Sequence, residues 1–161
     1  ANAPLRRLAA MYKEQKRDAD YRATLEKLRM SSPQELDSTL KLTELYKQSG
    51  DWPNVEKTAD WALGIDPYNP ETYKVLVEAR TKTARSPDAL GALAVLMSLD
   101  ASNTPVYRLQ RAHILADEKQ WDPAKTEVVR LLEDMPNFWE AQKLLLDIVD
   151  KRAPSAAGAA Q

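Results

Sequence analysis

Few side chains in this sequence could take part in covalent or metal chemistry. There is no cysteine, which excludes disulfides, thiolate nucleophiles and cysteine-bound zinc. The single histidine, His113, argues against a histidine-rich metal centre. A Ser–His–Asp triad could use only this histidine, and no Gly-x-Ser-x-Gly elbow accompanies it. Neither glycine-rich phosphate-binding motif, Gly-x-x-x-x-Gly-Lys or Gly-x-Gly-x-x-Gly, occurs. We therefore expect no cofactor and no metal.

Carboxylate pairs are the remaining candidates for catalysis. General acid–base chemistry needs two such groups to converge in a cleft from which water is excluded. The pairs in this sequence fall in turns and on polar helix faces: Asp18 with Asp20, Glu133 with Asp134, and Asp147 with Asp150. We interpret them as solvated charges or as charges at helix ends, and we expect no enzymatic activity.

Composition favours helices interrupted by proline. The 161 residues include 10 Pro but only 4 Gly, and 43% of the residues are hydrophobic. Lys and Arg number 23 against 24 Asp and Glu, and this balance argues against electrostatic attraction to nucleic acid or to an anionic membrane. No stretch reaches the roughly 20 apolar residues that a membrane span needs.

The breaks between helical segments recur with a period of about 34 residues. Segments end near Pro33, Pro67, Ala101 and Pro136, at spacings of 34, 34 and 35. Each later period is divided again in its middle by a proline-containing turn, at 50–53, 84–87 and 119–123. Proline suits the first turn of a helix, whose N–H groups have no intrahelical partner, and Ser86 and Asp122 are expected N-caps. The period is that of a helix–turn–helix repeat.

The residues at fixed places in each period resemble the tetratricopeptide repeat. The second period matches best, with Leu42, Tyr46, Gly50, Asp51, Val55, Ala59, Ala62 and Pro67. The first has Leu5, Leu8, Ala9, Tyr12, Tyr21 and Pro33, the third keeps Tyr73, Leu76 and Ala89, and the fourth keeps Ala112, Trp121, Ala124 and Pro136. The resemblance implies an all-α fold: a right-handed α-α superhelix, or solenoid, of about four helix-turn-helix repeats.

Domain boundaries follow from the same register. We expect one repeat domain over 1–152, with repeats at about 2–35, 36–69, 70–103 and 105–138, and a C-terminal capping helix over 138–151. Small residues such as Ala9, Ala59, Ala62 and Ala112 would let helix axes approach closely. The large residues Tyr12, Tyr46, Tyr73 and Trp61 are expected in the core. Residues 153–161 are rich in Ala, Gly and Ser, and we expect a tail or linker.

The resemblance also implies where a partner would bind. In tetratricopeptide proteins the first helices of the repeats line a concave groove that holds an extended or helical peptide. The register places these residues there: Arg6, Lys13, Lys41, Glu44, Lys74, Glu78 and His113. The series Arg6, Lys41 and Lys74 would suit an acidic partner segment; alternatively, these cations only keep a solvated face soluble.

Phe138 and Trp139 are a second candidate surface. Adjacent residues on a helix cannot face the same way, so one should pack on the fourth repeat while the other stays exposed. Aromatic anchors are favoured at interfaces, and self-association through the last helix would make the chain a weak homo-oligomer rather than a monomer. Capping the core is the simpler role.

Together these patterns predict a non-enzymatic scaffold that binds a protein or peptide partner. A structural spacer or self-association module of a larger polypeptide, which could carry its own enzyme domain, is the alternative. RNA binding is a third hypothesis, and the acidic middle of the chain opposes it. Because the sequence lacks an initiator Met, we expect a processed protein or a fragment. The absence of cysteine fits cytoplasm or periplasm, with a bacterial envelope slightly favoured.

Overall fold

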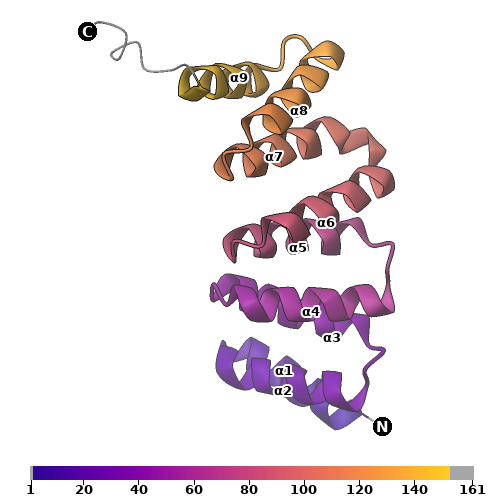
Figure 1. Cartoon of the computed structure of the whole chain (residues 1–161). Coiled ribbons are helices and arrows are strands. Elements are labelled where there is room, and N and C mark those ends of the chain that lie inside the picture. Colours follow the sequence, from indigo (N-terminus) through magenta and orange to yellow (C-terminus); the bar gives the residue numbers. More distant parts are fainter. Residues whose placement is uncertain (1, 153–161) are drawn as a thin grey trace, which may run out of the picture. The chain divides into compact units, whose positions relative to one another are not determined.

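The computed structural model describes residues 2–152, and these residues form α-helices joined by short turns and one 3₁₀ turn (Figure 1). The helices are α1 (Ala3–Glu14), α2 (Asp18–Ser31), α3 (Leu36–Gln48), α4 (Trp52–Ile65), α5 (Pro70–Lys82), α6 (Ser86–Leu99), α7 (Thr104–Asp117), α8 (Trp121–Asp134) and α9 (Trp139–Arg152), with the 3₁₀ turn η1 (Ala101–Asn103) before α7. The predicted all-α fold class is confirmed. The proposed tail, 153–161, lies outside the described residues.

Four of the turns use the same backbone device at the same period. Lys16, Gly50, Ala84 and Lys119 each have a positive φ, between 54° and 71°, and they are separated by 34, 34 and 35 residues. The N–H that follows each of them donates to the carbonyl five residues earlier, for example Asp51 to Tyr46 at 3.0 Å. This hydrogen bond is the Schellman cap, which satisfies carbonyls at the end of a helix. The period seen in the sequence is therefore a period of helix ends.

Helix starts combine proline with polar caps. Proline occupies one of the first two positions of α1, α4, α5 and α7. Asp51 accepts a hydrogen bond from the N–H of Asn54, and Asn69 accepts one from the N–H of Thr72. The predicted cap at Asp122 is wrong, because α8 begins one residue earlier and its N-cap is Gln120.

The chain divides after Arg85 into two compact units. In the first unit α1 packs on α2, α2 on α3, α3 on α4, and α4 on α5 (Figure 1). Its core is formed by Ala9, Tyr21, Leu25, Leu28, Leu42, Tyr46, Val55 and Ala79. Val55 is inaccessible to solvent, and so are the neighbouring alanines of α4, Ala59 and Ala62. Small side chains at these places let α4 pack closely on both of its neighbours.

The second unit is built in the same way from α6 to α9. Helix α7 packs on α6 and α8, and α8 packs on α9. Its core is formed by Ala112, Leu115, Ala124, Val128, Leu131, Ala141, Leu144 and Ile148. Helix α9 thus contributes three of these residues.

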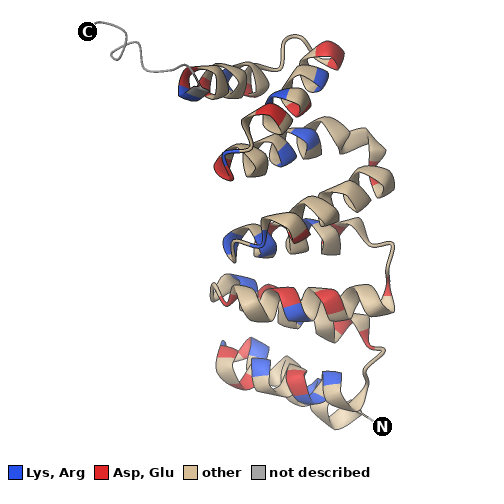
Figure 2. Ribbon diagram, in the orientation of Figure 1, with Lys and Arg blue, Asp and Glu red and all other residues tan. Residues whose placement is uncertain are grey.

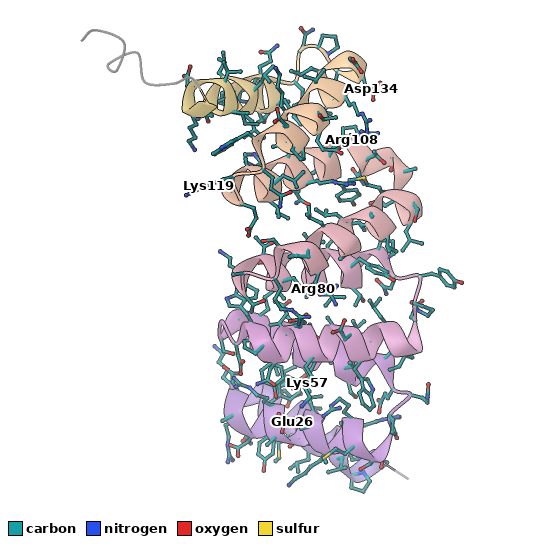
Figure 3. The ribbon with its side chains drawn as sticks, viewed as in Figure 1. Glu26, Lys57, Arg80, Arg108, Lys119 and Asp134 are labelled. Carbon is teal, nitrogen blue, oxygen red and sulfur yellow. The ribbon has the colours of Figure 1, made fainter. Side chains whose placement is uncertain are left out.

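A charged network ties α4 to α5 within the first unit. Glu56 of α4 is almost buried, with 9% of its side chain exposed, and accepts hydrogen bonds from Arg80 at 3.0 Å and Arg85 at 2.6 Å. Arg80 also reaches Asp60 at 3.0 Å, and Figure 3 shows Arg80 between the two helices. A buried carboxylate needs such partners to offset the loss of hydration, so the network fixes how α5 lies on α4.

One aromatic residue departs from the expected core. Trp61 is 42% exposed, whereas Tyr46 is only 7% exposed, so the prediction that Trp61 is buried is wrong. The buried row of α4 consists of Val55, Ala59 and Ala62, and Trp61 lies on a different face of that helix. Helical spacing predicted the helix correctly, but the position of the neighbouring helices decides which faces are covered.

Candidate functional site

A depression lies between the first helices of two successive repeats, α3 and α5. It has a volume of about 320 Å³ and is lined by Leu40, Thr43, Glu44, Lys47, Asn69, Glu71, Thr72 and Val75. Leu40, Glu44 and Lys47 follow one another at helical spacing on α3, and Glu71 and Val75 do so on α5. Lys47 joins the two helices through an ion pair with Glu78, at 2.7 Å. We call this depression the α3/α5 groove.

The α3/α5 groove contains some of the predicted binding residues and some that were not predicted. Glu44 lines it directly, and Glu78 reaches it through Lys47. Val75 and Thr72 were missed, although Glu71, Val75 and Glu78 share one helical face and the spacing alone could have included Val75. The large exposed apolar residue in the lining is Leu40, which has 37% of its surface accessible to solvent. The groove therefore offers an apolar contact with charged groups around it.

The three cations predicted to read an acidic partner are already paired. Arg6 lies 3.2 Å from Glu35, Lys41 lies 2.5 Å from Asp37, and Lys74 lies 2.6 Å from Glu71. The hydrogen bond with Asp37 is the main cause that raises the pKa of Lys41 above its ordinary value. Exposed pairs of this kind contribute at most about 1 kcal/mol. They nevertheless mean that an acidic ligand would have to displace carboxylates of the chain itself.

The other predicted residues lie on exposed helix faces. Lys13 is exposed on α1, and His113 is exposed on α7 of the second unit. Figure 2 shows acidic and basic residues interleaved along the helices of the first unit. Within residues 2–152 there is no group of three or more potential metal ligands, and no helix there is long and apolar enough to span a bilayer.

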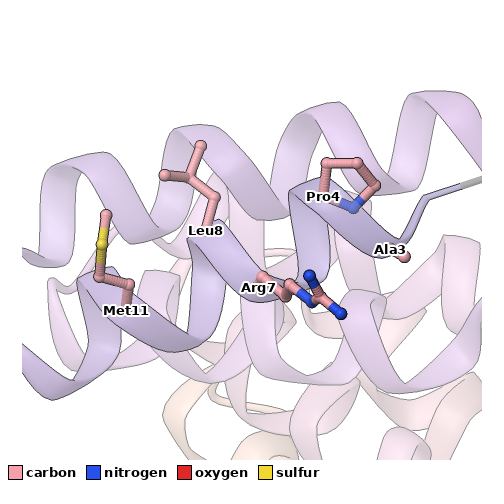
Figure 4. A pocket seen from close by; sticks show the side chains of 5 residues that line it. All are labelled: Ala3, Pro4, Arg7, Leu8 and Met11. Carbon is pink, nitrogen blue, oxygen red and sulfur yellow. The ribbon is translucent and has the colours of Figure 1, made fainter.

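A second depression lies on α1 and is mostly apolar. Figure 4 shows its lining, in which Pro4, Leu8 and Met11 follow one another at helical spacing and Arg7 is the charged member. Met11 is 41% exposed. The lining comes from one helix only, whereas the α3/α5 groove is shaped by two.

The two aromatic residues at the start of the last helix have different environments. Phe138 is half-buried and packs against the core of the second unit. Trp139 is 60% exposed, with the ammonium of Lys143 lying 5.7 Å from its ring centre. Leu146 and Val149, which are 65% and 48% exposed, follow Trp139 at helical spacing. Helix α9 thus has an exposed apolar row, which we call the α9 row.

Sequence comparison and structural comparison give different results. No family profile matches the sequence, and no curated protein sequence matches it. Solved structures do match. YrrB, described as a TPR protein with an unusual peptide-binding site, superposes with a TM-score of 0.71 and 16% identity over 94% of this chain and 78% of that chain.

Two further structures contain bound peptides. The first TPR domain of RPAP3 (Spaghetti), bound to an HSP90 peptide, matches with a TM-score of 0.61 and 21% identity over 75% of this chain and 95% of that chain. The Yersinia enterocolitica type III secretion chaperone SycD, in complex with a peptide of the translocator YopD, has a TM-score of 0.62 and 17% identity over 73% and 94% of the respective chains. At these identities the similarity shows the fold. The chain therefore has the helical-repeat fold of the tetratricopeptide repeat proteins.

Proposed function

We propose that this chain is a non-enzymatic scaffold that holds a segment of a partner protein in the α3/α5 groove. The observation that carries the proposal is the exposed Leu40 in a depression formed by two helices. An extended or helical peptide can place an apolar side chain in such a depression while its backbone stays near polar groups. Glu44, Lys47 and Glu71 line the same depression and supply such groups.

Structures with the same fold support this proposal. RPAP3 and SycD were each solved with a peptide bound, and YrrB is described by its peptide-binding site. An acidic partner is not required by the α3/α5 groove, since the lysine that lines it, Lys47, is paired with Glu78. Apolar contact at Leu40 and Val75 is the common requirement for any bound segment.

Peptide selection tests the proposal. Random peptides displayed on phage are selected on the immobilised chain, and each selected peptide is then measured against Leu40→Glu. We expect groove-binding peptides to lose affinity about tenfold or more, because a buried contact at the centre of a small interface is replaced by a desolvated charge. Val106→Glu is the matched control, since Val106 is 46% exposed on α7. If every selected peptide binds Leu40→Glu as well as the unaltered chain, the groove proposal is wrong.

The α9 row favours a second candidate function, self-association. Because Phe138 is half-buried, Trp139 is the aromatic residue that a second copy could contact. Light scattering over a range of concentrations should then show a molar mass that rises with concentration, and Trp139→Ala should abolish the rise. A constant monomer mass for the unaltered chain would exclude this candidate.

A further inference from the structure

Trp61 lies in a depression that shares no residue with the α3/α5 groove. The depression has a volume of about 440 Å³, and the residues that matter in its lining are Pro33, Lys57, Trp61, Gly64 and Ile65. Lys57, Trp61 and Gly64 follow one another at helical spacing on α4, and Pro33 comes from the turn before α3. We call this surface the Trp61 patch.

The Trp61 ring is held in place although it is 42% exposed. Its indole N–H donates a hydrogen bond to the carbonyl oxygen of Pro33, at 3.0 Å. The guanidinium of Arg29, from α2, lies 5.0 Å from the ring centre. A ring fixed at one edge and stacked on a cation loses little freedom when a partner covers it. Tryptophan and arginine are also the residues most often found at the energetic centre of protein interfaces.

Gly64 leaves the backbone of α4 bare beside this ring. Glycine destabilises a helix relative to alanine, and it is usually needed where φ is positive or where a side chain would collide. Neither reason applies here: a Cβ atom built at Gly64 meets nothing within 4 Å, and its φ lies outside the left-handed region. The backbone of α4 is therefore open beside the Trp61 ring, and another group can approach it closely there.

Charge indicates what that group is. Neither Lys57 nor Arg29 has a carboxylate partner among the described residues, whereas Arg6, Lys41 and Lys74, the cations predicted to bind an acidic segment, are each paired. Asp60, which also lines the depression, is bound by Arg80 at 3.0 Å. The Trp61 patch therefore has an apolar floor with unpaired positive charge beside it. A guanidinium in this position is suited to bind a carboxylate with two hydrogen bonds.

We propose that the Trp61 patch binds an acidic segment of a partner protein. A large apolar side chain of the segment lies over Gly64, against Trp61 and Ile65. Aspartate or glutamate residues next to it pair with Arg29 and Lys57. The Trp61 patch, rather than the concave groove, would then bind the acidic partner that the sequence analysis predicted. This proposal does not depend on peptide binding in the α3/α5 groove.

The phage selection described above also tests this proposal, because the two sites respond to different variants. We expect a class of selected peptides in which Asp and Glu flank a large apolar residue. Their affinity should fall about tenfold or more for Trp61→Ala and for Lys57→Glu, and should weaken as salt is added. Leu40→Glu should leave this class unchanged. If selection yields peptides that depend on Trp61 but none that depend on Leu40, the groove proposal is refuted and the Trp61 patch proposal is not.

Two glycine variants guard against a simple folding defect. Gly64→Leu fills the bare backbone without a collision, so it should weaken the acidic peptides about tenfold while keeping the helix intact. Gly91→Leu on α6 is the matched control, since a Cβ atom there also meets nothing within 4 Å, and it should not change binding. The proposal is overturned if no selected peptide depends on Trp61, if the dependent peptides are neutral or basic, or if Trp61→Ala abolishes only the pairing of two copies in light scattering.

Discussion

The repeated helix ends allow a prediction in which the same substitution has opposite effects at two glycines. Gly50 has a φ of 71° and caps α3, and a Cβ atom built there meets nothing within 4 Å. Gly50→Ala therefore adds no collision, only conformational strain. Gly64→Ala adds neither, because Gly64 is helical and its surroundings are also open. Any difference between the two variants reports on φ alone.

The magnitude follows from two opposing contributions. An L-residue in the left-handed conformation costs about 1–2 kcal/mol. Glycine loses about 0.5–1 kcal/mol more backbone entropy than alanine on folding. The difference is about 0.5–1 kcal/mol, by which Gly50→Ala should lower the free energy of unfolding. Ala84, at a φ of 56°, occupies the equivalent place one period later, so Ala84→Gly should raise this free energy by a similar amount.

Urea unfolding followed by circular dichroism measures both changes. With an m-value of about 2 kcal/mol/M, 1 kcal/mol corresponds to a shift of about 0.5 M in the midpoint. We expect the midpoint to fall for Gly50→Ala and to rise for Ala84→Gly. For Gly64→Ala it should also rise, by up to about 0.5 M, because alanine favours the helix. The reasoning is refuted if both alanine variants shift in the same direction, or if Ala84→Gly lowers the midpoint.

Two further predictions concern buried polar groups of the first unit. Glu56→Gln should destabilise the chain by about 3 kcal/mol in urea unfolding, because Arg80 and Arg85 lose a nearly buried carboxylate. Asp37→Asn removes a carboxylate from an exposed ion pair and should cost less than about 1 kcal/mol. Equal losses for the two variants would contradict this explanation. Burial, and then the hydrogen bond that it donates to Glu26, raise the pKa of Tyr46 from 10.0 to about 12. The neutral phenol therefore contributes stability that is complete below pH 10 and is lost as the pH rises to about 12. The urea midpoint of the unaltered chain should fall more steeply over this pH range than the midpoint of Tyr46→Phe. Parallel pH profiles of the two midpoints would disprove this prediction.

Much of the repeat architecture could be predicted from the sequence because its signals are local. Prolines in the first turn of a helix, polar caps and helical spacing act over a few residues, and the all-α fold class that they predict is confirmed. The left-handed residue of each turn was less visible. Gly50 indicates such a turn, but Lys16, Ala84 and Lys119 adopt the same φ without glycine. The conformational strain at these three positions is offset because the packing of the helices on either side requires the same turn.

The binding surfaces could be predicted only in part. Glu44 was predicted from its place in the repeat, since residues three and four apart share a helix face. Its partners across the α3/α5 groove, and the ion pair between Arg6 and Glu35, depend on helices about 30 residues apart in the chain. Trp61 shows the same limit, because its pattern is that of a core residue but the neighbouring segments leave 42% of it exposed.

The sequence by itself determined the class of fold, the period and the lack of cysteine chemistry, since these depend on residue types and short spacings. The tertiary structure decided which side chains are covered and which charges are paired between helices. Arg6, Lys41 and Lys74 form ion pairs with carboxylates, while Arg29 and Lys57 form none within residues 2–152. Two of these pairs are local to one helix, since Asp37 lies four residues before Lys41 and Glu71 lies three before Lys74. The pair of Arg6 with Glu35 and the exposure of Trp61 are tertiary, because they depend on the rotation of each helix about its axis and on what the neighbouring segments bring to that face.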